Sequence, residues 1–478
     1  MGVVGLNFGS ATSGQGFDVT STVNQIVANL QAVEMPWKSQ LTSLQNRDTA
    51  LSNLGSLIST LATDLQNLRD FNGVFASKTG SSSNTDELEL ISANSDAVAG
   101  SHEVTVQNLA RTSSAATDPL GASDTISGSI TLKVGQGAWQ TVNVGDASTP
   151  ATLAGLATAI NDAGIGVTAT VLANADSTVR LSLVSQTSGS AGQITIADST
   201  NNPSGPTTLA DETSAETGPA LGLATVQDGI DAKLTVDGVA LTSGSNTVSN
   251  AIPGVTFQLL ATASGSSGAA APVQVVIAND IPSIESAINT FVTDYNSTMK
   301  AINAQETRDS SGNPEPLFGT AVLAQLQQGL QSAMSQTFGT GQINSLIPLG
   351  ISASASADGT IALDSNALTS ALNSSFTQVA SLFQGTNSFG WSFAETLNNL
   401  GTSRKAGAIS LALSEDVSQE KSLNDNVSRQ EDLIAVQKAS LTAELSLANQ
   451  ILQSIPQQIQ QVDEIYSAIT GYSASKNG

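Results

Sequence analysis

The sequence predicts a multidomain α+β protein in which a terminal α-helical coiled-coil stalk carries two inserted β-rich head domains. Apolar residues recur at alternating intervals of three and four near both ends of the 478-residue chain, which is the heptad pattern of helices that pack along a narrow seam. The region between them has short alternating runs rich in Ser, Thr, Gly, Asn and Asp, which are typical of strands and turns. This order, helical, then β-rich, then helical, indicates β-rich domains inserted into a helical stalk. The first stripe is Leu51, Leu54, Ile58, Leu61, Leu65 and Leu68. The second is Leu441, Leu445, Ala448, Leu452, Ile455, Ile459, Val462, Tyr466 and Ile469.

Helical signals begin at Asp18, a suitable N-cap, and the apolar residues that follow it share one face. They are Val23, Ile26, Val27, Leu30 and Val33. A proline disfavours the helical conformation at the residue before it, so Pro36 predicts a break near Met35 and a second helix over about 37–68. Pro456 interrupts the second stripe, and there we expect a kink or a fresh helix start.

Short strands are expected after residue 77, with one helix among them at 152–161 that should cover one face of a small sheet. We interpret residues 197–220 as an exposed loop, because Asp, Asn, Pro, Gly, Ser and Thr dominate it. Helical periodicity resumes at Ile284 and recurs over 322–334 and 365–383. The expected strands are 101–107, 130–134, 139–144, 167–172, 179–184, 193–196, 232–236, 255–260 and 273–277.

These patterns divide the chain into four parts. Isolated helices are marginal without packing, so we expect the terminal segments to be flexible in a free monomer and ordered on contact with a partner. The parts are terminal helical leg segments at 1–40 and 435–478, a coiled-coil stalk at 41–77 and 280–434, a β-rich head domain at 78–120 and 226–279, and an inserted β-rich head domain with one helix at 121–225.

Composition excludes several classes of protein. The chain has no cysteine, which excludes disulfides, thiolate catalysis and cysteine-containing metal sites. Its formal charge of -24 predicts repulsion from nucleic acid and from anionic membranes. No run of about 20 apolar residues spans a bilayer, and the N-terminus lacks the pattern of a Sec-type signal peptide. These signals indicate a cytosolic protein, unless it leaves by a route that reads no cleaved signal.

No catalytic or metal-binding constellation can be assembled, so we expect no enzyme and no cofactor. His102 is the only histidine, and we interpret it as an exposed or edge-strand side chain. Asp358-Gly359 with Asp364 is half of a calcium loop without the remaining ligands, and predicts a β-turn before a short strand at 360–363. A run of acids at helical spacing is interpreted as a solvated helix face, with a protein-binding acidic patch as the alternative. These acids are Glu415, Asp416, Glu420, Asp425, Glu431 and Asp432.

Several short blocks, spread over nearly the whole chain in order, together resemble the flagellar filament cap proteins, a family also called hook-associated protein 2. The resemblance is mild at Gly16-Phe17-Asp18-Val19, where Gly-Leu-Asp is usual in the family. Residues 130–196 resemble a module shared by flagellins and hook proteins, and are less specific. The other blocks are Asp237-Gly238-Val239, Ser245-Asn246-Thr247-Val248, Ile252-Pro253-Gly254-Val255-Thr256, Phe291-Val292 with Tyr295-Asn296, Leu317-Phe318-Gly319, and Leu349-Gly350-Ile351 with Asp358-Gly359 and Leu363-Asp364.

The resemblance implies a non-enzymatic protein at the distal end of the bacterial flagellum, which promotes the folding and insertion of exported flagellin and prevents its leakage. It implies a homo-oligomeric ring, with a pentamer favoured over other stoichiometries, and secretion through the flagellar type III export apparatus. Flagellin, the hook-filament junction proteins and a cytosolic export chaperone that binds the C-terminal helix are the implied partners, with no nucleic acid and no membrane insertion.

Two sets of helical residues are assigned roles on this basis. Flagellin contacts are expected from helix faces that lack a partner within the subunit, and the stalk core from a seam that packs on the helices near 284–295 and 408–434. The expected flagellin contacts are Phe17, Asp18, Val23, Ile26, Val27, Leu30, Ile459, Val462, Ile465, Tyr466 and Ile469. The expected stalk core is Leu51, Leu54, Ile58, Leu61, Leu65, Leu68, Ile288, Phe291 and Tyr295.

Two alternative functions remain open from the sequence. One is another axial flagellar protein, such as a hook-filament junction protein, which would share the coiled ends. The other is a surface adhesin that binds host glycans or mucin through its Ser/Thr-rich β domains.

Overall fold

The computed structural model describes residues 16–471 apart from 146–149, 199, 203, 206, 212–218 and 264–270. The chain forms two compact units, one made of residues up to Asp70 together with those from Glu285 onward, and one made of Phe71–Ile284. The multidomain α+β class predicted from the sequence is confirmed, because helices near both ends flank a β-rich middle.

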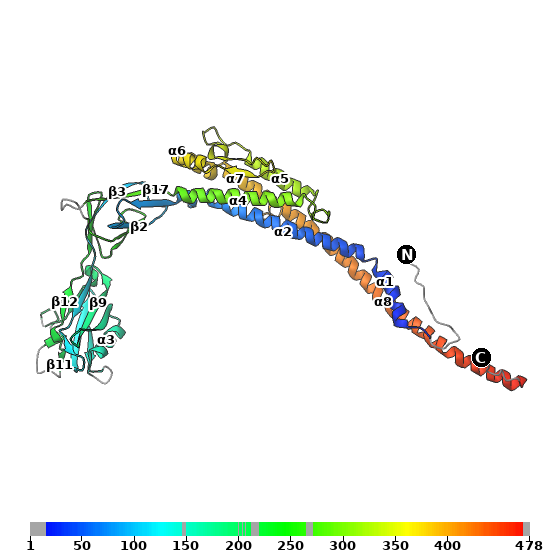
Figure 1. Cartoon of the computed structure of the whole chain (residues 1–478), viewed down its shortest axis with the longest axis horizontal. Coiled ribbons are helices and arrows are strands. Elements are labelled where there is room, and N and C mark those ends of the chain that lie inside the picture. The colour runs from blue at the N-terminus through cyan, green and yellow to red at the C-terminus, as the bar shows by residue number, and fades with distance from the viewer. Residues whose placement is uncertain are drawn as a thin grey trace. The chain divides into compact units, whose positions relative to one another are not determined.

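The first unit is helical. Its helices are α1 (Val19–Gln31), α2 (Met35–Arg69), α4 (Ile281–Gln305, which begins in the second unit), α5 (Ala321–Met334), α6 (Ser365–Gln384), α7 (Phe389–Leu400) and α8 (Ala408–Thr470). One short hairpin, β18 (Ile351–Ala353) with β19 (Ile361–Leu363), accompanies them. α2 packs against α8 and α7, and α1 lies along α8 (Figure 1).

The prolines act differently in the two terminal helices. Pro36 stands in the first turn of α2, where its missing N–H costs nothing, and α1 and α2 are separate helices as predicted. α8 continues through Pro456, so a fresh helix start at this position is wrong. The helix tolerates the proline, although Pro456 leaves the carbonyl of Leu452 without its usual helical donor.

The stalk core is built from the stripe of α2 and from aromatic side chains. Every member of the stripe from Leu51 to Leu68 is buried, as are Ile288, Phe291 and Tyr295 of α4. The ring of Phe393 on α7 lies 5.6 Å from that of Phe291 and 5.3 Å from that of Phe389, measured between centroids. α7 was not predicted, and its aromatic residues fill the space between α4 and α6.

The second unit is β-rich and contains two packed cores. In the first, a five-stranded antiparallel sheet in the order β1-β17-β3-β13-β14 faces a three-stranded sheet in the order β15-β16-β2, and apolar side chains from both sheets fill the space between them. The strands are β1 (Lys78–Ser82), β2 (Leu88–Ala93), β3 (Gly100–Asn108), β13 (Ala232–Val236), β14 (Val239–Ser243), β15 (Thr247–Ser249), β16 (Val255–Leu259) and β17 (Val273–Asn279).

The second core belongs to the inserted module. One sheet has the order β12-β4-β9-β5 with β8 on β9, the other has β10-β6-β11 with β7 on β6, and helix α3 (Leu153–Asp162) packs against β7 and β8. The strands are β4 (Thr112–Ala116), β5 (Leu120–Gly121), β6 (Ile126–Val134), β7 (Gln140–Val144), β8 (Val167–Ala173), β9 (Thr178–Ser188), β10 (Ile194–Ile196), β11 (Ala210–Asp211) and β12 (Ala224–Gln227). β4, which the sequence pattern assigns to the head-domain segment 78–120, pairs with β9 and β12 of the inserted module.

Candidate interaction surface on the terminal helices

Helix α1 is packed on α8 rather than left free. Asp18 caps α1, since its Oδ1 accepts a hydrogen bond from the Ser21 backbone N–H at 3.1 Å. Val23 and Val27 are 1% and 6% exposed, and they pack with Ile434 of α8. The expectation that this face lacks a partner within the subunit is therefore wrong for Val23 and Val27. Val19, Leu30, Leu441 and Leu445 are half-buried around this cluster.

The contact between α1 and α8 depends on the length of α8. Because one helix runs from Ala408 to Thr470, the first part of the C-terminal stripe lies beside α1 and supplies its partner. The start of α1 is also tied to α8, because the Phe17 backbone N–H donates to Asn449 Oδ1 at 2.8 Å. The apolar face of α1 and the start of the C-terminal stripe thus cover one another in part.

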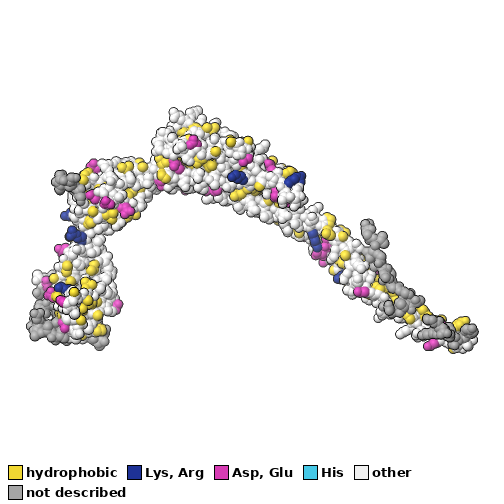
Figure 2. Space-filling model, viewed as in Figure 1, with side chains coloured by type: hydrophobic (Ala, Val, Ile, Leu, Met, Phe, Trp, Pro, Cys, Tyr) yellow, Lys and Arg dark blue, Asp and Glu magenta, His cyan; other side chains and the backbone are white. Residues whose placement is uncertain are grey.

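The last turns of α8 remain exposed along their apolar side. Ile459 is 43% exposed and Ile469 is 78% exposed, and the side chains between them at Val462, Ile465 and Tyr466 are exposed as well. Figure 2 shows some hydrophobic surface, in yellow, toward this end of the helix. Part of this face is hollowed into an open groove of about 290 Å³. Single exposed apolar residues are normal, but a row of five on one helix end is typical of a contact surface.

Sequence reasoning missed a second exposed row on α8. Leu433, Val436, Leu447 and Ile451 are all exposed, on a side of the helix away from Ile434. The pattern was weak because Ser440 interrupts it. The expected flexibility of 1–40 and 435–478 stays a prediction, and residues 1–15 and 472–478 lie outside the described part of the chain.

One member of the acidic face of α8 is not solvated. Asp416 is buried, and its Oδ1 forms an ion pair with the Arg47 guanidinium of α2. Burial and the neighbouring Asp48 carboxyl raise the pKa of Asp416 to about 6, against the lowering effect of Arg47. The sequence could not reveal this, because the helical spacing of acids says nothing about a partner on α2.

Three family-motif positions fix the course of the backbone in the second unit. Asp237 and Gly238 both have positive φ, at 50° and 81°, and form the two-residue turn between β13 and β14. Asn246 holds Ala110 at the base of the inserted module through both of its amide atoms: its Oδ1 accepts from the Ala110 N–H at 2.7 Å, and its Nδ2 donates to the Ala110 carbonyl at 3.0 Å.

The proline-glycine motif forms a second turn. The Val255 N–H donates to the Ile252 carbonyl at 3.0 Å, with Pro253 and Gly254 at the corners. Gly254 has φ 74°, which a type II turn requires at this position, and a Cβ there would approach Asn94 Oδ1 to 2.4 Å. Ile252 is buried in the head core.

Two motif positions fasten the small hairpin of the helical unit. The Ile361 N–H donates to Asn296 Oδ1 and Asn296 Nδ2 donates to the Ile361 carbonyl, both at 2.8 Å. Gly350 has φ 78° and lies so close to Asp364 that a Cβ would meet its carbonyl at 2.6 Å. These two motif residues hold backbone segments of the helical unit in place.

His102 is not at a sheet edge as one alternative held, because β3 is the central strand of its sheet. Its Nδ1 lies 2.7 Å from Asp237 Oδ2, and Asp237 Oδ1 accepts from the Glu103 N–H at 2.9 Å. These hydrogen bonds, that of His102 first, hold the pKa of Asp237 below its usual range. The pair anchors the hairpin turn.

The described residues offer no metal-binding group of three or more His, Cys, Asp or Glu side chains. Asp358 belongs to the turn before β19, where its Oδ1 accepts from the Thr360 N–H at 3.0 Å. None of the helices in the described ranges is long and apolar enough to cross a membrane.

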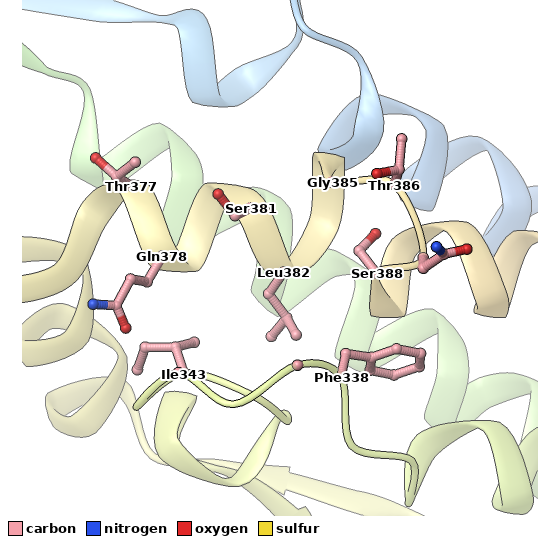
Figure 3. A pocket seen from close by; sticks show the side chains of 12 residues that line it. Phe338, Ile343, Thr377, Gln378, Ser381, Leu382, Gly385, Thr386 and Ser388 are labelled. Atoms are coloured by element: carbon pink, nitrogen blue, oxygen red, sulfur yellow. The ribbon is translucent and has the colours of Figure 1, made fainter.

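A cavity of about 380 Å³ lies between α6 and the segment 338–343. Figure 3 shows Gln378 and Leu382 directed from α6 toward Ile343, with Phe338 beside them. None of its lining residues is titratable, so the cavity offers no general acid, general base or charged ligand.

Segments from both ends of the chain match models of a known protein family. Residues 15–113 match the family described as flagellar hook-associated protein 2 N-terminus, and residues 229–468 match the C-terminus of the same protein. This chain belongs to the flagellar hook-associated protein 2 family. The two matches leave out residues 114–228, which correspond to the inserted module.

Individual relatives agree with this assignment. The B-type flagellar hook-associated protein 2 of Pseudomonas aeruginosa is 30% identical over 388 residues, which cover 77% of this chain and 79% of the relative. The flagellar hook-associated protein 2 of Escherichia coli K12 is 25% identical over 386 residues, which cover 78% of this chain and 79% of the relative.

A solved structure shares the fold. The flagellar cap protein FliD of Escherichia coli, in a structure of its D1-D2-D3 domains, superimposes with a TM-score of 0.55 at 23% identity and covers 77% of this chain and 99% of that chain. The stalk with β-rich head domains is therefore an arrangement that this family uses.

Proposed function

We propose that this chain caps the distal end of the flagellar filament as a ring of copies, five in number, and that the exposed end of α8 packs against flagellin. Membership of the hook-associated protein 2 family places the chain among filament cap proteins, which assemble in the flagellum and contact flagellin, and favours this function over the adhesin. A hook-filament junction protein is likewise less well supported, because both matches name the cap family.

The exposed apolar row on α8 is the observation that carries the proposal. Burial of one large aliphatic side chain stabilises a contact by about 1.5–3 kcal/mol, so the five side chains from Ile459 to Ile469 could hold a subunit on a protein surface. The net charge of -24 disfavours a membrane or nucleic acid as the partner. A helical groove on another protein is the complementary surface.

The action we propose requires no catalysis. A cap of this kind supplies a sheltered surface beneath the ring, on which exported flagellin folds, and the cap is displaced as each subunit is added. The family is a structural one and not an enzyme family.

Three further partners belong to the same proposal. The chain would leave the cell through the flagellar type III apparatus, accompanied until then by a cytosolic chaperone on its C-terminal helix. Hook-filament junction proteins would receive the cap before the filament grows. The apolar end of α8 supports the chaperone contact, because an exposed row of this kind needs cover before export.

Electron microscopy of the purified full chain tests the ring. We expect closed rings or stacked pairs of rings at micromolar concentration, viewed down a symmetry axis. A uniform population of monomers at the highest soluble concentration, in the presence and absence of flagellin, would contradict the proposal. As a control, a chain truncated after residue 454 retains the head domains and the stalk core, and separates ring formation from flagellin binding.

A further inference from the structure

Two pairs of carboxyl groups face each other along α2. Asp416 of α8 contacts Asp48 of α2, and Asp64 of α2 contacts Asp294 of α4. Asp416 is 0% exposed, whereas the other three are half-buried. Figure 1 shows α8 and α4 running beside α2. Each pair therefore links α2 to a neighbouring helix.

Each pair leaves buried oxygen atoms without a donor. Asp48 Oδ1, Asp64 Oδ2 and Asp416 Oδ2 are buried and receive no hydrogen bond from the described residues. A buried carboxylate oxygen without a donor loses its hydration and gains nothing in return. Two carboxylates in contact also repel each other, whereas a single proton between them turns one oxygen into a donor and removes both costs.

A neighbouring positive charge offsets part of the negative charge of one pair, that of Asp416 and Asp48. Arg47 of α2 forms an ion pair with Asp416, which offsets some of the negative charge. Glu420 lies one turn further along α8 and also has a buried oxygen without a partner, so it adds negative charge on the same side of the helix. The charged groups that act on Asp416 are thus Asp48 and Arg47, with Glu420 one turn along the same helix, and Asp64 faces Asp294.

We propose that these two carboxyl pairs make the stalk a proton-dependent clamp. Each pair shares one proton at mildly acidic pH, which holds α8 and α4 closely on α2. Loss of that proton toward neutral pH adds a negative charge to each contact and weakens the stalk. The proposal is independent of flagellin binding, because it concerns contacts within one subunit.

The direction of the pH dependence follows from the raised pKa values. Burial, followed by the Asp294 carboxyl, raises the pKa of Asp64 from 3.8 to about 6, and burial followed by Asp48 does the same for Asp416. The folded chain therefore binds more protons than the unfolded chain between these values, and its stability falls as pH rises through this window and levels off above the folded pKa.

Carboxyl groups with lowered pKa values act in the opposite direction. Asp358 and Glu395 stabilise the folded chain as they ionise, and their pKa values lie below the ordinary range. These groups are already ionised at pH values below the interval in which the two pairs lose their protons. Their contribution to the stability of the folded chain is therefore constant across that interval. A scan from pH 5 to pH 8 therefore reports mainly on the two pairs.

Thermal unfolding of the full chain and of the Asp48→Asn/Asp64→Asn double variant tests the clamp. Asparagine keeps the shape of aspartate, supplies a permanent donor to Asp416 and Asp294, and carries no charge. We expect the Tm of the wild-type chain to fall by about 5 °C between pH 5 and pH 7.5. The Tm of the variant should fall by about half as much or less, because only the buried Asp416 carboxyl still loses a proton there, and it should exceed the wild-type value at pH 8.

A control removes two charges of the same sign elsewhere on α8. Asp425 and Asp463 are exposed, so the Asp425→Asn/Asp463→Asn variant should retain the wild-type pH dependence. The proposal is overturned if the wild-type Tm is constant or rises over this interval, or if the Asp48→Asn/Asp64→Asn variant falls as steeply as the wild type.

Hydrogen exchange of the wild-type chain supplies a test that needs no variant. After correction for the intrinsic pH dependence of exchange, peptides that cover residues 44–52 and 412–420 should lose at least threefold of their protection between pH 5 and pH 8. Equal corrected protection at the two pH values would overturn the proposal.

Discussion

A strain that carries Val462→Ser, Ile465→Ser and Ile469→Ser together should release flagellin into the medium to the same extent as a strain that lacks the gene. These side chains are exposed in the subunit, so their removal should leave the Tm of the purified chain within about 1 °C of the wild-type value. If they are buried against flagellin, their loss costs on the order of 5 kcal/mol of binding, which weakens the contact more than a thousandfold.

A matched variant distinguishes loss of the apolar surface from loss of helix propensity. Gln457→Ser, Gln460→Ser and Gln461→Ser change three exposed polar residues of the same helical segment. This variant should retain motility and secrete no excess flagellin. Normal filaments in the strain with the Val462, Ile465 and Ile469 substitutions, or equal leakage from both variants, would mean that the apolar row does not bind flagellin.

Phe393→Ala should destabilise the helical unit strongly. The Phe393 ring is buried between those of Phe291, Phe389 and Tyr295, with centroid distances of 5.6, 5.3 and 6.5 Å. Removal of a buried aromatic ring costs about 3–5 kcal/mol, which should lower the Tm by about 10 °C.

Trp391→Ala is the control on the same helix. Its indole is 58% exposed and lies under the Arg69 guanidinium, 4.9 Å from it, a contact worth about 1 kcal/mol or less at such a site. The two variants compared by calorimetry should therefore differ several-fold in their effect on unfolding. Equal effects would show that the aromatic cluster does not form the centre of the core.

Periodicity predicted the stalk seam because it depends on neighbours along one helix. The stripe from Leu51 to Leu68 is buried along its length, as its spacing of three and four requires. The same reasoning failed for α7, whose residues Phe389 and Phe393 follow a short turn and pack against Phe291, far away in sequence. A helix whose core partners are non-local gives a weak local signal.

The identity of a helix partner was equally hidden from the sequence. Val23 and Val27 form a clear apolar face, but only the length of α8 shows that Ile434 covers it. The acid spacing of α8 likewise predicted a solvated face, and only the fold shows that Arg47 and Asp48 lie beside Asp416. The sequence pattern shows which face of a helix is apolar or charged. The segment that packs against this face depends on the topology of the fold.

The family motifs were informative for a different reason. Gly254 and Gly350 adopt backbone conformations with positive φ in close contact with other backbone, and Asn296 bonds both polar groups of Ile361. Such positions accept few residue types, so they form recognisable blocks in the sequence. They identify the fold, while the proposed binding residues on α8 lie outside these blocks.

Hydrogen exchange over residues 455–471 tests the central claim, that the exposed end of α8 is the surface that binds the filament. The measurement compares the free chain with the chain bound to short flagellin filaments, under identical pH and temperature. We predict rapid exchange in the free chain and at least tenfold slower exchange in the complex, with little change over residues 51–68 of the stalk seam. Identical exchange of residues 455–471 in the two samples would contradict the account.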